Sequence, residues 1–326
     1  MNVRDLVRVL SDGQFHSGEQ LGEAFGVSRT AIWKQLQKLE TLGIVLEAVR
    51  GRGYRIAQPL ELLDGGRIVA GLSRESRQQL SRLFIESQLE STNTFLLERF
   101  AQGAGHAEVC VAEVQTAGRG RRGRTWHGRW GAGIHFSLGW RFDSGVAAIE
   151  GLSLALGVRM AELLDPLGVD VRLKWPNDLL VEQAGEGRKL GGILTEMRGD
   201  MEGPCEVVIG IGFNVSFGEA DRQRLEQPAA GLHEMVPELS RNELITGMID
   251  GLMGLLPHFE HEGFAAWQTG WNARHYHANQ PVTLQQGSQR WEGIAQGVNK
   301  QGNLVVCIDE REVIFSGGEV SLRASR

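Results

Sequence analysis

The sequence predicts an α+β protein of several domains. Three observations lead to this fold class: residues 1–58 have an amphipathic, helix-rich pattern, the middle of the chain mixes helix and strand patterns, and the final residues form short strands separated by turns. A chain of 326 residues is long enough for two or three domains and at least one large core. We place the domains at residues 1–63, 66–275 and 277–326.

The composition is that of a soluble globular protein, with 41% hydrophobic and 23% charged residues. No apolar run reaches the length of a membrane span, and the chain begins with an amphipathic pattern where a signal peptide would have an apolar core. We therefore expect a cytoplasmic protein with no membrane partner. Cys110, Cys205 and Cys307 lie far apart without metal-ligand spacing, which indicates reduced, packed thiols and no metal site among them.

The N-terminal segment has the outline of a winged helix-turn-helix. A first amphipathic helix ends at the Ser-Asp-Gly of 11–13, and the spacing of Ser17 and Gln20 is that of a capping box that begins a second helix. Ser28 is expected to cap a third helix, whose apolar stripe leaves the polar side chains on the other face. A hairpin follows, with strands at 45–47 and 54–56 and a basic tip at 50–53.

This arrangement favours DNA binding, with the third helix in the major groove and the hairpin as a wing on the flanking backbone. Residues 1–58 hold eight Lys and Arg against six Asp and Glu, in a chain whose net charge is −6. One copy would bind weakly, so two copies on a two-fold operator are expected. A module that binds only protein is the alternative. The predicted DNA contacts are Ser28, Arg29, Thr30, Lys34, Arg50 and Arg52.

Residues 118–124 place four arginines among three glycines. Guanidinium groups suit phosphate or carboxylate, and glycine lets the backbone approach such a ligand. Strand-like runs at 109–114 and 134–140 flank this arginine loop, so we expect an ordered anion cradle in preference to a disordered basic segment that contacts RNA. The glycine spacing also matches the dinucleotide fingerprint, but no helix would begin at the third glycine, which excludes that interpretation.

The rest of the central segment alternates helix and strand patterns. Residues 207–215 have the apolar continuity of a buried central strand, and its glycines indicate close approach of a ligand or of another backbone. The other predicted elements are a helix at 94–100, an apolar helix at 149–164, a strand at 169–175 that Pro176 stops, and paired strands at 179–181 and 190–197 around a loop at 182–188.

The C-terminal segment consists of short strands at close spacing, with turn residues at 287–288, 302–303 and 317–318 between them. This pattern resembles a small β-barrel of SH3 type. The predicted strands are 282–285, 291–296, 304–308, 313–315 and 320–322.

Four motifs of the central segment, in their order and spacing, resemble those of the biotin–protein ligase family: Ser91-Thr92-Asn93, residues 115–126, Lys174-Trp175-Pro176-Asn177-Asp178, and residues 188–194. With the N-terminal helix-turn-helix and the Gly-Gly-Glu-Val-Ser-Leu-Arg of 317–323, essentially the whole chain resembles the bifunctional bacterial ligases that also repress the biotin operon. The resemblance implies a biotin/lipoate-ligase-like mixed α/β catalytic domain.

The resemblance also implies the chemistry. ATP, with Mg²⁺, would activate the carboxylate of biotin as biotinoyl-5′-AMP, and the biotin would pass to a lysine of a biotin carboxyl carrier protein domain. The adenylate would be the corepressor: it would order the arginine loop, promote a homodimer and so place two N-terminal domains on operator DNA. A lipoate-type ligase and a non-enzymatic biotin sensor are the alternatives.

Three residues are expected to be catalytic by this resemblance. Lys189 would contact the biotin carbonyl and the α-phosphate, and Arg121 would stabilise phosphate charge. Asp178 would orient either Mg²⁺–ATP or the incoming lysine amine. The remaining predicted biotin and adenylate contacts are Ser91, Thr92, Asn93, Gln115, Gly118, Arg119, Gly120, Arg124, Trp126, Lys174, Asn177, Gly191 and Asn214. The three residues from Ser91 are equally suited to cap the helix that follows them. The His and Arg within 126–130 depart from the expected pattern.

Overall fold

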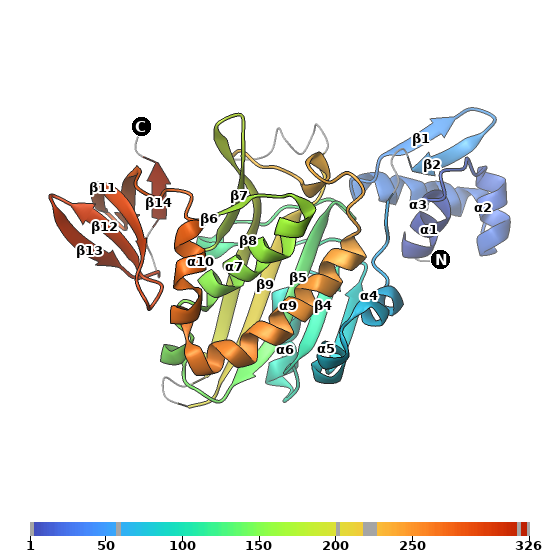
Figure 1. Ribbon diagram of the computed structural model, residues 1–326. Helices are drawn as coiled ribbons and strands as arrows, with labels where there is room; N and C mark the ends of the chain where they lie inside the picture. Colours follow the sequence, from blue (N-terminus) through green and yellow to red (C-terminus); the bar gives the residue numbers. More distant parts are fainter. Residues whose placement is uncertain (1–2, 57–59, 200–202, 218–226, 318–320, 325–326) are drawn as a thin grey trace.

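The computed structural model describes residues 3–56, 60–199, 203–217, 227–317 and 321–324. It confirms an α+β chain with three parts (Figure 1). A small helical domain and a small β domain lie at opposite ends of a larger central domain, which is a sheet covered by helices.

The N-terminal domain confirms the predicted helices and their caps. It contains α1 (Val3–Leu10), α2 (Gly18–Phe25), α3 (Arg29–Thr41), β1 (Leu46–Val49) and β2 (Gly53–Ile56). The capping box is formed: the Ser17 hydroxyl accepts from the Gln20 N–H at 3.1 Å, and the Gln20 side chain accepts from the Ser17 N–H at 2.8 Å. The Ser28 hydroxyl accepts from the Ala31 N–H at 3.2 Å and so begins α3. The first hairpin strand was predicted one residue early, since Val45 is outside β1 and exposed.

The core of the N-terminal domain includes two residues of the central domain, Val114 and Trp130. The Trp130 N–H donates to the carbonyl of Leu42, at the end of α3, at 3.3 Å. The Arg129 guanidinium donates to the carbonyl of Gly43, also at 3.3 Å. The unusual charge within 126–130 is thereby explained for Arg129, because its side chain attaches the central domain to the end of α3.

The central domain is built on a seven-stranded sheet with the order β3-β4-β5-β9-β8-β7-β6. The β3–β4 pair is parallel and every other neighbouring pair is antiparallel. Its strands are β3 (Arg82–Glu86), β4 (Glu108–Ala112), β5 (Gly133–Phe142), β6 (Val171–Lys174), β7 (Asp178–Gln183), β8 (Glu186–Gly199) and β9 (Cys205–Asn214). The predicted central strand is confirmed as β9, which lies between β5 and β8.

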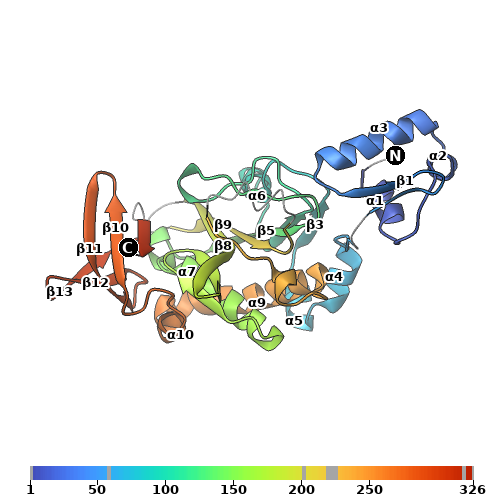
Figure 2. The same cartoon turned by 90° about the horizontal axis from the view of Figure 1, so that it is seen from above.

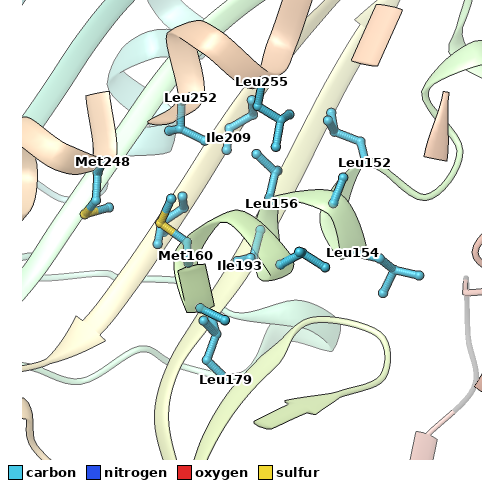
Figure 3. Packing of buried hydrophobic residues seen from close by; sticks show 14 of the residues in the cluster. Leu152, Leu154, Leu156, Met160, Leu179, Ile193, Ile209, Met248, Leu252 and Leu255 are labelled. Atoms are coloured by element: carbon cyan, nitrogen blue, oxygen red, sulfur yellow. The ribbon is translucent and has the colours of Figure 1, made fainter. Parts of the chain in front are cut away.

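Helices cover both faces of this sheet (Figure 2). One face packs against α7 (Leu152–Leu164) and α9 (Arg241–Glu262), with α4 (Gly65–Gly71), α5 (Arg74–Gln79) and α10 (Gln268–Ala273) beside them. Figure 3 shows the contact region, where Leu156 and Met160 of α7 and Leu252 of α9 meet Ile209 of β9. The other face carries α6 (Thr92–Ala101), whose Leu96 and Phe100 form a smaller core with the sheet.

Several predicted boundaries in this domain shift by one or two residues, and two differ by more. The apolar helix begins at Leu152 and not at residue 149. Val146–Ile149 form a separate 3₁₀ turn, and Gly151, with a left-handed φ of 79°, separates this turn from the helix. The predicted loop at 182–188 is only a two-residue hairpin turn. Ala184 and Gly185 both have positive φ, 53° and 77°, which is the backbone of a tight turn between antiparallel strands.

The longest helix, α9, and the shorter α4, α5 and α10 are absent from the sequence prediction. A signal for α9 is present, however: Ser240 accepts from the Glu243 N–H at 3.2 Å, and this Ser-x-x-Glu spacing precedes a long apolar pattern. The α9 helix supplies many of the buried residues of the main core. The sequence stretch between the site motifs and the C-terminal strands therefore builds the scaffold.

The C-terminal domain is a five-stranded antiparallel sheet with the order β13-β12-β11-β10-β14. Its strands are β10 (Pro281–Gln286), β11 (Gln289–Val298), β12 (Leu304–Ile308), β13 (Arg311–Phe315) and β14 (Ser321–Ala324). The small β domain is thus confirmed. The predicted last strand began at Val320, which lies outside the described residues.

The segment at 60–64, which we call the linker into the central domain, is held by a buried network of ion pairs and hydrogen bonds. Arg241, at the start of α9, lies 2.7 Å from Glu113, and these side chains are 2% and 0% exposed. The second oxygen of Glu113 accepts from the Leu63 N–H at 2.8 Å, and Glu61 accepts from the Arg241 N–H at 2.6 Å. Since Gly131 also donates to the Glu113 carbonyl, the network joins the linker to the segment that carries Trp130.

Three buried histidines make stability depend on pH. Burial lowers the pKa of His135, His275 and His277 to about 4, from an ordinary 6.5. The unfolded chain therefore binds protons below pH 6.5 that the folded chain accepts only near pH 4. We expect the unfolding free energy to fall by about 1–2 kcal/mol per histidine between pH 7 and pH 5, as measured by urea unfolding.

The control for this prediction is His261, an exposed histidine of α9. Replacing His275 by Gln should make the pH dependence shallower, because one buried neutral ring no longer takes up a proton on unfolding. His261→Gln should leave the dependence unchanged. A free energy of unfolding that is the same at both pH values would contradict the prediction.

Candidate active site

One pocket of about 760 Å³ gathers most of the predicted site residues. It lies between the arginine loop, the start of α6 and the strands β5, β7, β8 and β9. Gly118 and Gly191, which were also predicted as ligand contacts, are not in its lining. The predicted residues that line the pocket are Ser91, Thr92, Asn93, Gln115, Arg119, Gly120, Arg121, Arg124, Trp126, Lys174, Asn177, Asp178, Lys189 and Asn214.

Lys189 and Asp178 form an ion pair in this pocket. The Lys189 Nζ lies 2.6 Å from a carboxylate oxygen of Asp178, and both side chains are 16% exposed. The ammonium also lies 5.6 Å from the centroid of the Trp126 ring, within the range of a cation–π contact. The pair places a fixed cation, a carboxylate and an aromatic face around one space.

A register shift in the sheet makes this pairing possible. Between β7 and β8, Leu179 pairs with Gly191 but Leu180 pairs with Lys189, so β8 contains one extra residue. In a regular ladder, Lys189 would face the other side of the sheet from Asp178. The bulge turns its side chain to the face that Asp178 shares with Leu180.

The arginine loop contacts four other parts of the molecule: α6, β8, the turn between β6 and β7, and the C-terminal domain. Arg119 lies 3.0 Å from Glu196 of β8 and donates to the Thr94 hydroxyl at 3.1 Å. Arg121 donates to the Asn177 side chain at 3.5 Å and to the carbonyl of Gly317 from the C-terminal domain. The loop closes on itself where the Gly120 N–H donates to the Arg124 carbonyl at 2.7 Å.

The pKa of Arg121 is affected by its position. Burial and the nearby charge of Arg122 lower the pKa of its guanidinium, while Asp178 acts in the opposite direction. A guanidinium remains protonated in proteins. An incoming phosphate would therefore meet a partly desolvated cation, whose attraction for an anion is stronger than in water.

The start of α6 is held by hydrogen bonds within the protein. The Ser91 hydroxyl caps the helix through the Thr94 N–H at 3.4 Å. Gln115 accepts from the Thr92 N–H at 2.8 Å through its side-chain oxygen, which leaves its NH₂ group free to donate elsewhere. The Asn93 amide donates to Glu196 at 2.7 Å and accepts from Ser137, so it joins the helix to the sheet. The capping interpretation of this motif is confirmed, and its contact with biotin stays a prediction.

Two of the remaining predicted residues, Asn177 and Asn214, donate from their side-chain amides to backbone carbonyls of β8. The Asn177 amide donates to the Ile193 carbonyl at 2.7 Å, and the Asn214 amide donates to the Lys189 carbonyl at 3.0 Å. Lys174 ends β6 beside them. Gly191 leaves room for a backbone, because a Cβ there would meet the Gly212 carbonyl at 2.6 Å.

Sequence reasoning missed His135, which lines the pocket from β5 and is 2% exposed. Its Nδ1 lies 3.4 Å from the Gln115 amide nitrogen, and its Nε2 has no hydrogen-bond partner among the described residues. Gly210 and Gly212 of β9 also line the pocket, at the strand where the sequence predicted close approach of a ligand or of another backbone. The groups that approach them are the side chains of Asn93 and Trp126.

Three further features of the described residues concern metal clusters, thiols and membrane-spanning helices. The described residues contain no cluster of three or more His, Cys, Asp or Glu side chains that could hold a metal ion. Burial raises the pKa of the Cys110 and Cys205 thiols, which disfavours the reactive thiolate. Across the same described part of the chain, no helix has both the length and the apolar character needed to span a membrane.

Known proteins match each part of this architecture. Residues 84–214 match the biotin/lipoate A/B protein ligase family, residues 2–55 an HTH domain, and residues 277–323 the biotin protein ligase C terminal domain. The bifunctional ligase/repressor BirA of Escherichia coli is 39% identical over 321 residues, which cover 98% of this chain and 97% of BirA. The chain belongs to the biotin protein ligase family.

Two further relatives agree with this membership. A biotin–[acetyl-CoA-carboxylase] ligase of Mycobacterium tuberculosis is 33% identical over 73% of this chain and 88% of its own. A structure of the biotin protein ligase of Aquifex aeolicus in complex with biotin and ATP superposes with a TM-score of 0.62 at 25% identity, over 75% of this chain and 100% of that one. This member of the family is a bifunctional biotin ligase and repressor, since it carries the HTH domain beside the ligase domain.

Proposed function

We propose that this biotin ligase joins biotin to ATP, with release of pyrophosphate, and passes the biotinoyl group from the adenylate to a lysine of a biotin carrier domain. The observation that carries the proposal is the Lys189–Asp178 pair, which shares one pocket with Trp126 and the arginines at 119 and 121. The cations of this combination suit the negative charge of an acyl-phosphate, and the Trp126 ring offers an aromatic surface on which the adenine base can stack.

In the first step, a carboxylate oxygen of biotin attacks the α-phosphorus and the bond to pyrophosphate breaks. Negative charge collects on the phosphoryl oxygens, and fixed cations stabilise it. Lys189 would leave Asp178 for the α-phosphate and the biotin carbonyl, while Arg119 and Arg121 would exchange their contacts with Glu196 and Gly317 for the ligand.

In the second step, the neutral amine of a lysine attacks the carbonyl of the mixed anhydride, the bond to AMP breaks so that AMP leaves, and the amine proton passes to solvent. Among the described residues that line the pocket, Asp178 is the one carboxylate, and it can orient this amine. It can alternatively orient Mg²⁺–ATP in the first step, because Mg²⁺ binds through one or two carboxylates and substrate phosphates. Asp178→Asn distinguishes the roles: loss of transfer alone supports the amine, and loss of both steps supports the metal.

The ligase reaction is tested by biotin-dependent exchange of pyrophosphate into ATP, with lipoate as the competing acid. Exchange that requires biotin and is not supported by lipoate would establish the proposed substrate. Tight binding of biotin without exchange would instead support a sensor that does not catalyse, and exchange with lipoate alone would support the lipoate-type ligase.

The repressor activity is proposed to depend on a homodimer in the cytoplasm. The adenylate would replace the present contacts of the arginine loop, favour association of two central domains, and place two N-terminal domains on a palindromic operator. Sedimentation and operator binding with and without biotin plus ATP test this proposal. Dimer and operator affinities that are unchanged by biotin plus ATP would overturn it.

A further inference from the structure

One large apolar side chain on α3 lies outside the core of the N-terminal domain. Ile32, Leu36 and Leu39 of this helix are 0%, 3% and 0% exposed, whereas Trp33 is 51% exposed. Half of the Trp33 side chain is therefore available to a partner, and tryptophan is enriched at interfaces, where its ring packs against apolar groups.

The position of Trp33 places it near the start of α3. The helix begins after Ser28, so Trp33 lies little more than one turn from that end. The central domain contacts the opposite end, at Leu42 and Gly43. Figure 2 shows α3 along one edge of the domain. The half of the helix that carries Trp33 is therefore the half that a partner can reach.

The neighbours of Trp33 indicate what that partner is. Residues three and four positions away on a helix share its surface. Here these are the buried Leu36 and the exposed Arg29, Thr30 and Gln37. Lys34 is exposed beside them. A single aromatic ring among cations, a hydroxyl and an amide differs from the broad apolar patch of a protein interface. Cations, hydroxyls and amides are the groups that contact phosphates and base edges, while apolar groups contact the thymine methyl.

We propose that Trp33 is a base-reading residue, which packs against the C5-methyl group of a thymine in the major groove of each operator half-site. This inference rests on the proposed operator binding. The phosphate contacts from Arg29, Lys34 and the hairpin tip would orient α3, and Trp33 would add a preference at one base step.

The test begins with selection of binding sites from a randomised DNA duplex library by the full chain, in the presence of biotin and ATP. The wild type should select a two-fold motif with a thymine in each half-site that Trp33→Ala no longer selects, while the other positions remain. Changing that thymine to deoxyuridine removes only the methyl group. It should weaken wild-type binding roughly fourfold per half-site, and it should leave Trp33→Ala binding unchanged.

The controls separate the possible failures. Val45→Ala removes another exposed apolar side chain of the same domain and should leave the selected motif unchanged. Because Trp33 is exposed, Trp33→Ala should keep the melting temperature and the pyrophosphate exchange of the wild type. No motif selected by the wild type would overturn operator binding itself. The same motif selected by both proteins, or a loss of affinity that is uniform over all sequences, would overturn the role of Trp33 alone.

Discussion

Lys189→Ala is expected to lower biotin-dependent pyrophosphate exchange by roughly 10²–10³-fold, the usual effect of removing one group that stabilises developing charge. In the folded protein the Lys189 ammonium lies 2.6 Å from Asp178 and over the Trp126 ring, inside the pocket that the arginine loop borders. A cation held there is desolvated and needs little rearrangement to reach an α-phosphate. The measurement is the steady-state exchange rate at saturating biotin and ATP.

The pattern of kinetic constants decides what Lys189 does. A fall in kcat indicates contact with the transition state, while a rise in KM for biotin with unchanged kcat indicates binding alone. Lys38→Ala removes an exposed lysine of α3 and should leave exchange unchanged. Exchange by Lys189→Ala within a few-fold of the wild type would contradict the role assigned to this residue.

Arg241→Met is expected to destabilise the protein by about 3–5 kcal/mol, because it leaves the carboxylate of Glu113 buried without its cation. Glu113 is fully buried, and Arg241 also donates its backbone N–H and a guanidinium N–H to Glu61. The network joins the linker to both α9 and the segment of Trp130. The measurement is the free energy of unfolding in urea at pH 7.

A matched pair on the surface provides the control. Arg290 and Glu292 also form an ion pair, but their side chains are 65% and 63% exposed. Arg290→Met should therefore change the free energy of unfolding by less than about 1 kcal/mol. The double variant Arg241→Met, Glu113→Gln should recover part of the loss, because the uncompensated charge is gone. Equal effects of Arg241→Met and Arg290→Met would contradict the prediction.

Local features of the fold were predictable where neighbouring residues determine them. The Ser17 capping box, the Ser28 cap and the Ser91 cap depend on contacts within four residues, and all three are present as expected. The arginine loop was identified as a site for the same reason, since the chemistry of guanidinium does not depend on the rest of the fold. The motifs that resemble the ligase family then located most of the pocket lining.

Features that depend on distant partners were not predictable. Neither the bulge that turns Lys189 toward Asp178 nor the contact of Arg121 with Gly317 is encoded by local spacing. The role of His135 at the pocket has no signal in the sequence, because an alternating strand pattern does not predict which distant side chains will contact its polar residues. The contact of Trp130 with α3 joins residues that are about ninety positions apart.

The sequence by itself determined the three-part architecture, the helix caps and the composition of the ligand-binding motifs, because periodicity, capping and charge act over a few neighbouring residues. Only the tertiary structure decided how these motifs meet. Strand register placed Lys189 and Asp178 on one face, and packing of distant segments attached the linker to α9. Such contacts arise from burial and from hydrogen bonds between residues that are far apart along the chain, which no short pattern specifies.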